Sequence, residues 1–356
     1  MSEFLSRRFA GLQAYTPGEQ PQDMQYLKLN TNESPYAPSP GVMERINREE
    51  VEKLRLYPDP ECSGLVRRLA QRYGVLPENI AVGNGSDELL AFSFMAFCDG
   101  QIGVAFPEIS YGFYEVYAAL LGIDALKVPL REDFSICPRD YAGLGRTIVI
   151  ANPNAPSGLA LSPQQIEEIL QNNPHNLVLV DEAYVDFGAQ SCVPLIGKYP
   201  NLLVIQTFSK SRSLAGGRLG FAIAQPEIIR DLNTMKYSFN PYNINRLTLL
   251  AGEASLEDEG ESYYRSCAQK ICAAREFTKK ELAARGFLQT DSQANFLFAR
   301  HPALAGELLY RKLREKGILV RYFGKEKIEN YVRITVGTQQ QMQKLLSAVD
   351  EIMAEV

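Results

Sequence analysis

The sequence predicts an α/β protein with a large, mostly parallel sheet that helices cover on both faces (α/β/α layering). A smaller α+β domain is expected after this sheet, and an extended arm before it. Its length of 356 residues allows two domains. From about residue 75, short apolar runs alternate with longer helical patterns, which is typical of parallel strands joined by helices. The hydrophobic fraction of 46% and the charged fraction of 22% are those of a globular protein, so extensive disorder and fibrous repeats are excluded.

The chain divides into three predicted parts. Residues 1–40 are rich in Pro, Asn and Gly and are expected to form the N-terminal arm, which completes the small domain and contributes a lid. Residues 41–250 are expected to form the large domain and residues 251–356 the small one. A polar helical pattern from about Leu256 to Arg285, with Gly286 as its stop, connects the two domains.

The strands predicted for the large sheet are nearly continuous apolar runs, as expected of strands that are buried on both faces. Helical patterns lie between several of them, at Asp87–Phe97 and at Ser162–Gln171, where Ser-Pro is a typical helix start. The predicted strands are Asn79–Val82, Ile102–Phe106, Ala125–Pro129, Thr147–Ala151, Leu177–Val180, Leu202–Gln206 and Leu219–Ala224.

The small domain is predicted from a second alternation of short apolar runs and helical patterns. The order of the elements indicates an α+β arrangement. The strands are expected at Asn295–Ala299, Ile318–Arg321 and Tyr331–Val336, and the helices at Ala303–Lys316 and Gln339–Met353.

Charge and composition limit the classes of partner. Lys+Arg 37 against Asp+Glu 42 gives a net charge of −5, which argues against a nucleic-acid surface. The longest uncharged apolar stretch, Leu89–Cys98, is far shorter than the ~20 residues that a membrane span needs. Met1–Phe4 does not open a signal peptide, and the six cysteines are scattered without a C-x-x-C pair. We therefore expect a cytoplasmic protein with free thiols and no nucleic-acid or membrane partner.

The two histidines carry no recognisable motif. His175 lies in a predicted turn and His301 in a predicted loop. A Ser-His-Asp triad or a multi-histidine metal site needs histidine where the chemistry occurs. The sequence therefore predicts no metal site, and an enzyme with this sequence would move protons with another residue.

One lysine stands in an unusual position. Lys210 follows the predicted strand Leu202–Gln206, with hydroxyl residues on both sides and Arg218 eight residues later in a glycine-rich run. A lysine in a desolvated pocket has a lowered pKa and can form a Schiff base with an aldehyde. Thr207, Ser209 and Arg218 can together hold a phosphate. The alternative is an exposed Ser-Lys-Ser loop, and this segment alone does not decide between the two.

Two further segments place polar groups directly after strands, where a mostly parallel sheet binds its ligands. Asp181 follows a buried strand and can keep a heterocyclic nitrogen protonated, or it can cap a helix. Gly83–Glu88 follows another strand and opens a helix, whose backbone amides can bind phosphate. It does not match a dinucleotide-binding fingerprint, because Glu88 stands where that pattern has glycine.

Two more segments follow strands in the same way. Tyr111, in Phe106–Gly112, offers a ring for stacking on a ligand, or it packs in the core. Asn152–Gly158 is rich in Asn, Pro and Gly, and its other interpretation is an ordinary turn.

Taken together and in this order, these segments resemble the fold-type I pyridoxal-phosphate aminotransferases, and within that group the histidinol-phosphate aminotransferases. The resemblance covers essentially the whole chain. Lys210, Asp181 and Arg218 match many aminotransferases, whereas Asn32–Tyr36 and Tyr57–Pro60 match the narrower family. The other matching segments are Leu29–Pro40, Gly83–Glu88, Ser110–Gly112, Asn152–Gly158, Asp181–Tyr184, Ser209-Lys210 and Val332–Gly337.

The resemblance implies pyridoxal 5′-phosphate as the cofactor and Lys210, Asp181 and Tyr184 as the catalytic residues. Lys210 forms the Schiff base and then moves the proton between the substrate and the cofactor. Asp181 pairs with the ring nitrogen, Tyr184 donates to the 3′ oxygen and Tyr111 stacks on the ring. The residues implied for the phosphate are Gly85, Ser86 and Asp87, chiefly through backbone amides, with Thr207, Ser209 and Arg218.

The resemblance also implies partners and substrate contacts. Tyr57 reaches the phosphate of the other subunit's cofactor, so the active unit is expected to be a homodimer. Arg333 holds the substrate carboxylate or phosphate, and Arg321 is a second anion holder. Asn32 and Tyr15, on the arm, are expected to be lid residues. Arginines at strand edges are also often solvated or salt-bridged, which is the alternative for both arginines.

One departure from the family pattern concerns the 3′ oxygen. The family usually has asparagine immediately before the Pro-Thr/Ser-Gly turn, and this chain has Ala155 there. Asn154 or a water takes over this contact, or Tyr184 acts alone. The pair Gly216-Gly217 is also less typical than Gly-Leu before the phosphate arginine.

The implied reaction is the transamination of histidinol phosphate with 2-oxoglutarate, which gives imidazole-acetol phosphate and glutamate in histidine biosynthesis. An aromatic amino-acid aminotransferase and an amino-acid-phosphate decarboxylase on the same fold are alternatives, because the sequence does not fix which ring fits the pocket. A binding protein without catalysis is disfavoured, because Lys210 and Asp181 are both present.

Overall fold

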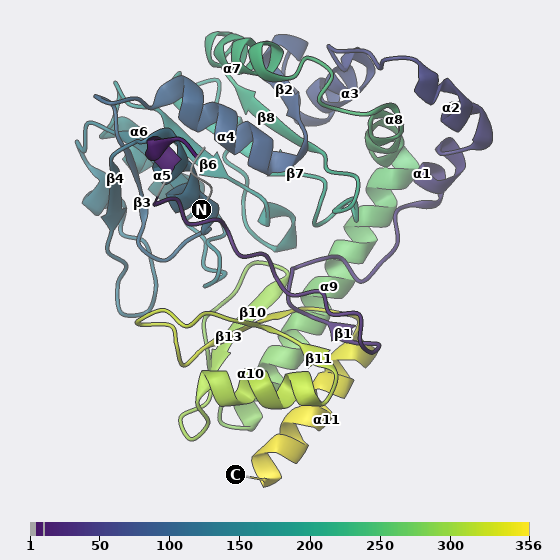
Figure 1. Ribbon diagram of the computed structural model, residues 1–356, viewed down its shortest axis with the longest axis vertical. Helices are drawn as coiled ribbons and strands as arrows, with labels where there is room; N and C mark the ends of the chain where they lie inside the picture. The colour runs from purple at the N-terminus through teal and green to yellow at the C-terminus, as the bar shows by residue number, and fades with distance from the viewer. Residues whose placement is uncertain (1–4, 10, 356) are drawn as a thin grey trace.

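The larger part of the molecule is built on a seven-stranded sheet with the strand order β2-β8-β7-β6-β5-β3-β4. The structure, a computed structural model, describes residues 5–9 and 11–355 (Figure 1). Only β8 runs in the direction opposite to the other six strands, so the sheet is mostly parallel, as predicted. The strands are β2 (Ile80–Gly83), β3 (Val104–Pro107), β4 (Ala125–Val128), β5 (Thr147–Ala151), β6 (Val178–Asp181), β7 (Leu202–Thr207) and β8 (Gly220–Ala224).

Helices cover both faces of this sheet. Ile148 and Val149 are neighbours on β5, yet they belong to two different buried clusters, because successive side chains of a strand point to opposite faces. The cluster of Ile148 includes residues of α3 (Ser63–Tyr73), α6 (Pro163–Gln171) and α8 (Arg246–Ser255). The cluster of Val149 includes residues of α4 (Gly85–Phe97), α5 (Phe113–Leu121) and α7 (Pro226–Phe239).

Most predicted strands begin or end within two residues of the observed ones, and β5 matches its predicted bounds. The strand predicted from Ile102 begins instead at Val104. The reason is a turn, in which Asp99 Oδ1 accepts hydrogen bonds from the backbone amides of Gln101 and Ile102 at 2.6 and 2.7 Å.

The smaller part of the molecule contains a four-stranded antiparallel sheet with the order β12-β13-β10-β9. Its apolar cluster includes residues of the long helix α9, which runs from the large sheet to the small one (Figure 1). The elements are α9 (Asp258–Ala284), β9 (Leu288–Gln289), β10 (Phe296–Arg300), α10 (Gly306–Glu315), β12 (Arg321–Tyr322), β13 (Val332–Thr335) and α11 (Gln339–Ala354).

The strand predicted at Ile318–Arg321 is in fact two strands that belong to different sheets. Its first half, β11 (Ile318–Leu319), pairs in parallel with the arm strand β1 (Leu27–Lys28). Its second half begins β12, which pairs with β13. The arm thus adds a strand beside the small sheet and then runs toward the large one (Figure 1).

The remaining helices are α1 (Pro40–Arg45) and α2 (Arg48–Glu52), which lie at the outer edge of the large part (Figure 1). The predicted domain boundary at residue 250 falls inside α8, and the apolar residues of α8 on both sides of it pack on the large sheet. Within the residues that the structure describes, no helix is both long and apolar enough to cross a membrane.

Candidate active site

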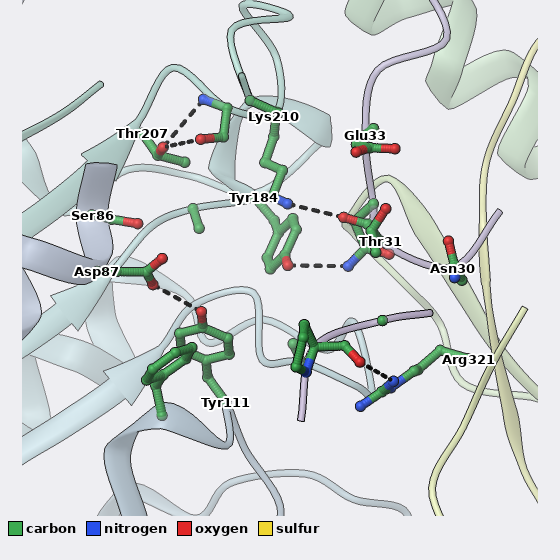
Figure 2. Close-up of a pocket in the computed structure, with 18 of the residues that line it drawn as sticks. Asn30, Thr31, Glu33, Ser86, Asp87, Tyr111, Tyr184, Thr207, Lys210 and Arg321 are labelled. Atoms are coloured by element: carbon green, nitrogen blue, oxygen red, sulfur yellow. Dashed lines mark hydrogen bonds between the residues drawn. The ribbon is translucent and has the colours of Figure 1, made fainter. Parts of the chain in front are cut away.

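A cavity of about 690 Å³ lies at the carboxyl edge of the large sheet, between that sheet, the small sheet and the arm (Figure 2). The ends of β5, β6 and β7 meet there, because Ala151 is paired with Asp181 and Asp181 with Ile205. The cavity wall contains most of the residues that the sequence predicts for the site: Tyr15, Asn32, Ser86, Asp87, Tyr111, Asp181, Tyr184, Thr207, Ser209, Lys210, Arg218, Arg321 and Arg333.

Lys210 follows β7 and points its amine into this cavity (Figure 2). Its Nζ donates to the backbone oxygen of Thr31 at 3.2 Å and lies 5.8 Å from the centre of the Tyr184 ring. Burial, with the charge of Arg333 as a smaller cause, lowers the pKa of Lys210 to about 8. A far larger fraction of this amine is therefore neutral near physiological pH than for a lysine in water.

Asp181 ends β6 and is almost completely buried. Its Oδ2 accepts from the hydroxyl of Tyr114 at 2.8 Å, and its Oδ1 accepts from the Ala183 amide at 3.2 Å. Burial raises the pKa of Asp181 to about 6, although both hydrogen bonds oppose this rise. Because the next helical turn begins only at Val185, Asp181 caps no α-helix, and its carboxylate is available to a cation in the cavity.

Tyr184 stands opposite Lys210 and is tied to the arm. Its hydroxyl oxygen accepts from Asn32 Nδ2 at 3.0 Å (Figure 2). Its ring packs edge-on against Phe296, with the ring centres 5.1 Å apart. Burial raises the pKa of Tyr184, so the phenol is protonated at neutral pH and can donate a hydrogen bond.

The start of α4 forms an anion cradle with the loop after β7. Gly85 has a left-handed backbone with φ of 79°, and a Cβ on it would lie 2.6 Å from the guanidinium of Arg218. A Cβ on Gly220 would lie 2.5 Å from the Ser86 amide, so both glycines permit a close approach of backbone to the site. Asn84 places no side-chain cap on α4, which leaves the first amides of the helix to a ligand.

Hydroxyl groups and a guanidinium complete the cradle. Thr207 Oγ1 and Ser209 Oγ lie 3.0 Å apart, and Arg218 Nη1 lies 3.4 Å from Ser209 Oγ. Arg218 also forms an ion pair with Asp87 at 3.1 Å, and the hydroxyl of Tyr111 donates to the same carboxylate at 2.8 Å. This set of donors is the kind that binds a phosphate group.

Arg333 lies on β13 in the cavity wall, with its guanidinium 5.4 Å from the Phe296 ring and 5.6 Å from the Phe323 ring. Its Nη2 donates to the Asn30 backbone oxygen at 2.9 Å. Within the described residues, its buried Nε has no hydrogen-bond partner, and neither have Asn30 Oδ1 and Thr31 Oγ1 in the same wall. Because these three atoms lie in the wall of one cavity, they are available to a bound molecule, and the charged group among them, the Arg333 guanidinium, is positive.

Arg321 and Tyr15 bring the arm to the cavity. Arg321 donates to the backbone oxygens of Thr16 and Pro17 at 2.9 and 3.2 Å. Tyr15 stacks on Phe113 with the ring centres 4.1 Å apart. The guanidinium expected to be a second anion holder therefore also holds the arm in place.

Three predicted residues lie outside the cavity wall. Gly85 lies close to Arg218, since a Cβ on it would meet the guanidinium. Asn154 was expected at the cofactor, but its amide group donates to the Ile109 oxygen at 2.9 Å and accepts from Ser110 Oγ at 2.8 Å, and Ala155 lines the cavity instead. Tyr57 is 79% exposed and stacks on Tyr242.

The sequence matches the model of the family aminotransferase class I and II over residues 24–349. A protein of Brachyspira hyodysenteriae named histidinol-phosphate aminotransferase is 49% identical over 99% of each chain. A Marinomonas protein of the same name is 51% identical over 98% of this chain and 99% of its own. This chain belongs to the histidinol-phosphate aminotransferase family.

Solved structures of histidinol-phosphate aminotransferases have the same fold. The enzyme of Sinorhizobium meliloti in complex with pyridoxal-5′-phosphate is 25% identical, with a TM-score of 0.85 over 93% of this chain and 92% of that chain. The enzyme of Clostridium acetobutylicum is 24% identical, also with a TM-score of 0.85, over 93% of this chain and 100% of that chain. The predicted fold-type I aminotransferase architecture is therefore confirmed.

Several residues of this aminotransferase site were not predicted from the sequence. Tyr114, the partner of Asp181, lies near the start of α5 and three residues after Tyr111, and this nearness in sequence to a predicted site residue was a usable signal. Thr335 and Phe323, which contact Asn32 and Arg333, carry no comparable signal.

Proposed function

We propose that this chain transfers the amino group of histidinol phosphate to 2-oxoglutarate, with pyridoxal 5′-phosphate as cofactor, giving imidazole-acetol phosphate and glutamate in histidine biosynthesis. One observation carries the proposal. A single cavity contains a lysine amine with a lowered pKa, a buried carboxylate, an anion cradle and an arginine whose Nε has no hydrogen-bond partner among the described residues. The names of relatives that are about half identical over the whole chain support the choice of substrate.

The cavity residues fit the cofactor part by part. The cradle of Ser86, Thr207 and Ser209 with Arg218 suits its phosphate, and the buried Asp181 suits its ring nitrogen. When bound, the cofactor supplies an aldehyde for the substrate amine and a ring that stabilises negative charge at the substrate carbon.

The protein residues then divide the remaining work. Lys210 Nζ, with a pKa of about 8, can both accept and release a proton near neutral pH, so it serves as general base and general acid. Asp181 remains ionised beside a protonated ring nitrogen, because the opposite charge offsets its desolvation. Tyr184 donates its phenol proton toward the cofactor ring, and Tyr111 is expected to cover the face of that ring.

Arg333 is proposed to orient both substrates. Histidinol phosphate carries a phosphate where an amino acid carries its carboxylate, and 2-oxoglutarate carries two carboxylates. A guanidinium binds either group in bidentate fashion, so one arginine can serve both half-reactions.

A substrate comparison tests the proposed function. We expect the purified protein to transaminate histidinol phosphate with 2-oxoglutarate with a kcat/KM at least ~100-fold above that for phenylalanine or tyrosine, because only the phosphate substrate offers a doubly charged group to the arginines. Glutamate formation measures the reaction. A preference for phenylalanine would establish the aromatic aminotransferase. Release of carbon dioxide from an added phosphorylated amino acid, such as O-phosphothreonine, would establish the decarboxylase.

We also propose that the active unit is a homodimer. Large apolar side chains that are exposed in the single chain gather on α1, on α2 with the turn that follows, and at the end of α7, and such patches are typical of interfaces. Tyr57 belongs to this surface and lies outside the cavity of its own chain, as expected of a residue that reaches the partner's site. The residues are Met43, Ile46, Val51, Leu54, Leu56, Tyr57, Tyr237, Phe239 and Tyr242.

Mixing two impaired variants tests whether Tyr57 reaches the site of the partner subunit. Lys210→Ala and Tyr57→Ala homodimers are each expected to be weak at limiting cofactor, because each site carries one defect. After subunit exchange half of the dimers are hybrids, and each hybrid has one site with both defects and one with neither. We expect about a quarter of the wild-type activity to return. Activity equal to the mean of the separate variants would place Tyr57 in the site of its own chain.

A cytoplasmic location is proposed from the cysteines. All six are unpaired, and four of them are buried. Unpaired cysteines are typical of proteins in reducing compartments.

A further inference from the structure

Asn32 connects the arm, the small sheet and the cavity through four hydrogen bonds. Its backbone amide donates to Thr335 Oγ1 at 2.9 Å, and its side-chain Oδ1 accepts from the same hydroxyl at 3.0 Å. Its Nδ2 donates to the Tyr184 hydroxyl at 3.0 Å, and its backbone oxygen accepts from Asn295 Nδ2 at 3.0 Å. Asn32 is 1% exposed, so water does not compete for these groups.

The chemistry of the groups fixes the direction of this chain of hydrogen bonds. A backbone amide can only donate, so the Thr335 hydroxyl accepts from Asn32 N and has its own proton left to give. That proton goes to Asn32 Oδ1, because a carbonyl oxygen can only accept. The carbonyl side of the Asn32 amide therefore faces Thr335, and its NH₂ side faces Tyr184.

The direction at Tyr184 follows from this orientation. Its hydroxyl oxygen accepts from Asn32, so its own proton is not used in that contact. Within the described residues this is the one hydrogen bond of the hydroxyl, and Tyr184 lines the cavity (Figure 2). The phenol proton is therefore free to be donated into the cavity.

We propose that Asn32 and Thr335 are positioning residues that fix Tyr184 as a hydrogen-bond donor toward the cavity. The proposal rests on the proposed function only for the identity of the acceptor, the ring oxygen of the cofactor. Ala155 lines the cavity and offers no donor, so Tyr184 carries this contact without help from the residue before Pro156. A phenol that already accepts one hydrogen bond is also a better donor, because hydrogen bonds in a chain polarise one another.

The backbone at Asn32 supports this role. Its φ of 56° lies in the left-handed region, which costs energy in most residues and is tolerated best by glycine and asparagine. Residues held in such a conformation cluster at functional sites. Here it allows the amide nitrogen and the side chain of one residue to meet the same hydroxyl.

Within the described residues, the Thr335 hydroxyl is the one hydrogen-bond partner of Asn32 Oδ1, so its loss leaves the orientation of the Asn32 side-chain amide unfixed. The group can then rotate by half a turn and present its oxygen to Tyr184, which would take the phenol proton and end the donation into the cavity. The variant Thr335→Val removes the hydroxyl and keeps the shape, whereas Thr335→Ser keeps the hydroxyl and is the matched control.

The first measurement uses the protein without cofactor. Protein labelled with 3,5-difluorotyrosine, a more acidic phenol, is titrated by fluorine NMR, and the signal of residue 184 is assigned by its loss in Tyr184→Phe. A donor at the oxygen stabilises the phenolate, so its loss in Thr335→Val should raise the midpoint of residue 184 by about one pH unit, or tenfold. Thr335→Ser should leave the midpoint unchanged.

A second variant guards against poor folding of Thr335→Val. Asn32→Gly accepts the left-handed backbone and keeps the hydrogen bond from the backbone amide of residue 32 to Thr335. It removes the side chain that donates to Tyr184, so the same rise is expected. An unchanged midpoint in both variants, or an equal rise in Thr335→Ser, would overturn the proposal whatever the enzyme's substrate.

The second measurement adds pyridoxal 5′-phosphate and follows the pH midpoint of its visible absorption. Thr335→Val should raise this midpoint in the wild-type background and leave it unchanged in the Tyr184→Phe background, because the effect passes through the phenol. A shift of equal size in both backgrounds indicates a merely structural role and overturns the proposal. Absence of any bound cofactor, with the fluorine result as expected, would instead overturn the proposed function alone.

Discussion

Replacing Lys210 with alanine is expected to lower kcat/KM for histidinol phosphate by at least ~10⁴-fold while the protein still binds pyridoxal 5′-phosphate. Lys210 is the proposed covalent partner and the proposed proton carrier, and positioned acid–base groups alone contribute about 10²–10⁴-fold. The cofactor should remain bound, because the phosphate cradle and Asp181 do not depend on the lysine side chain. Single-turnover kinetics and equilibrium dialysis measure the two effects.

A pH profile and a control make the Lys210 prediction specific. Burial lowers the pKa of Lys210 to about 8, so the neutral amine that captures the cofactor forms as the pH rises through about 8 rather than near 10.5. The rate of cofactor capture by the cofactor-free protein should follow this midpoint. Lys344→Ala, at an exposed lysine of α11, should change neither the rate nor the profile. Borohydride reduction that labels a lysine other than Lys210 would contradict the assignment.

The sequence predicted the large sheet well because the signal is local. A strand buried on both faces is an apolar run, and its bounds are visible in the chain itself, as for β5. The two strands at Ile318–Leu319 and Arg321–Tyr322 were read as one, because they differ only in their partners. The partner of the first is an arm strand almost 300 residues away, which no local pattern announces.

The same limit applies to the site. Asp181, Lys210 and the glycine loop were predicted because each follows a strand, and parallel strands end at a common edge. Tyr114, Thr335 and Asn295 were not predicted, because their importance lies in hydrogen bonds to residues 67 to 303 positions away. The direction in which a side-chain amide points is a further property that local sequence does not show. Asn154 was expected at the cofactor, but its amide binds Ile109 and Ser110, whereas the amide of Asn32 faces Tyr184.

Replacing Arg333 with alanine is expected to weaken both half-reactions by about 2–5 kcal/mol, or roughly 30- to 5,000-fold in kcat/KM. The guanidinium lies between two aromatic rings, and its buried Nε has no protein partner in the described part of the chain, so it is free to bind an anion. Both the phosphate of histidinol phosphate and a carboxylate of glutamate would lose their charged partner. Single-turnover kinetics with each substrate measure the loss, and a loss confined to one half-reaction would contradict a shared anion site.

Arg321→Ala is the matched comparison, because Arg321 and Arg333 are directly opposite each other on the paired strands β12 and β13. Arg321 lines the same cavity, and its donors to Thr16 and Pro17 also hold the arm. If its charge strengthens the field for a doubly charged phosphate, Arg321→Ala should reduce kcat/KM for histidinol phosphate at least ~10-fold more than for phenylalanine. If Arg321 serves only to hold the arm, both substrates should lose equally, since neither then depends on its charge. Equal losses would assign anion binding to Arg333 alone.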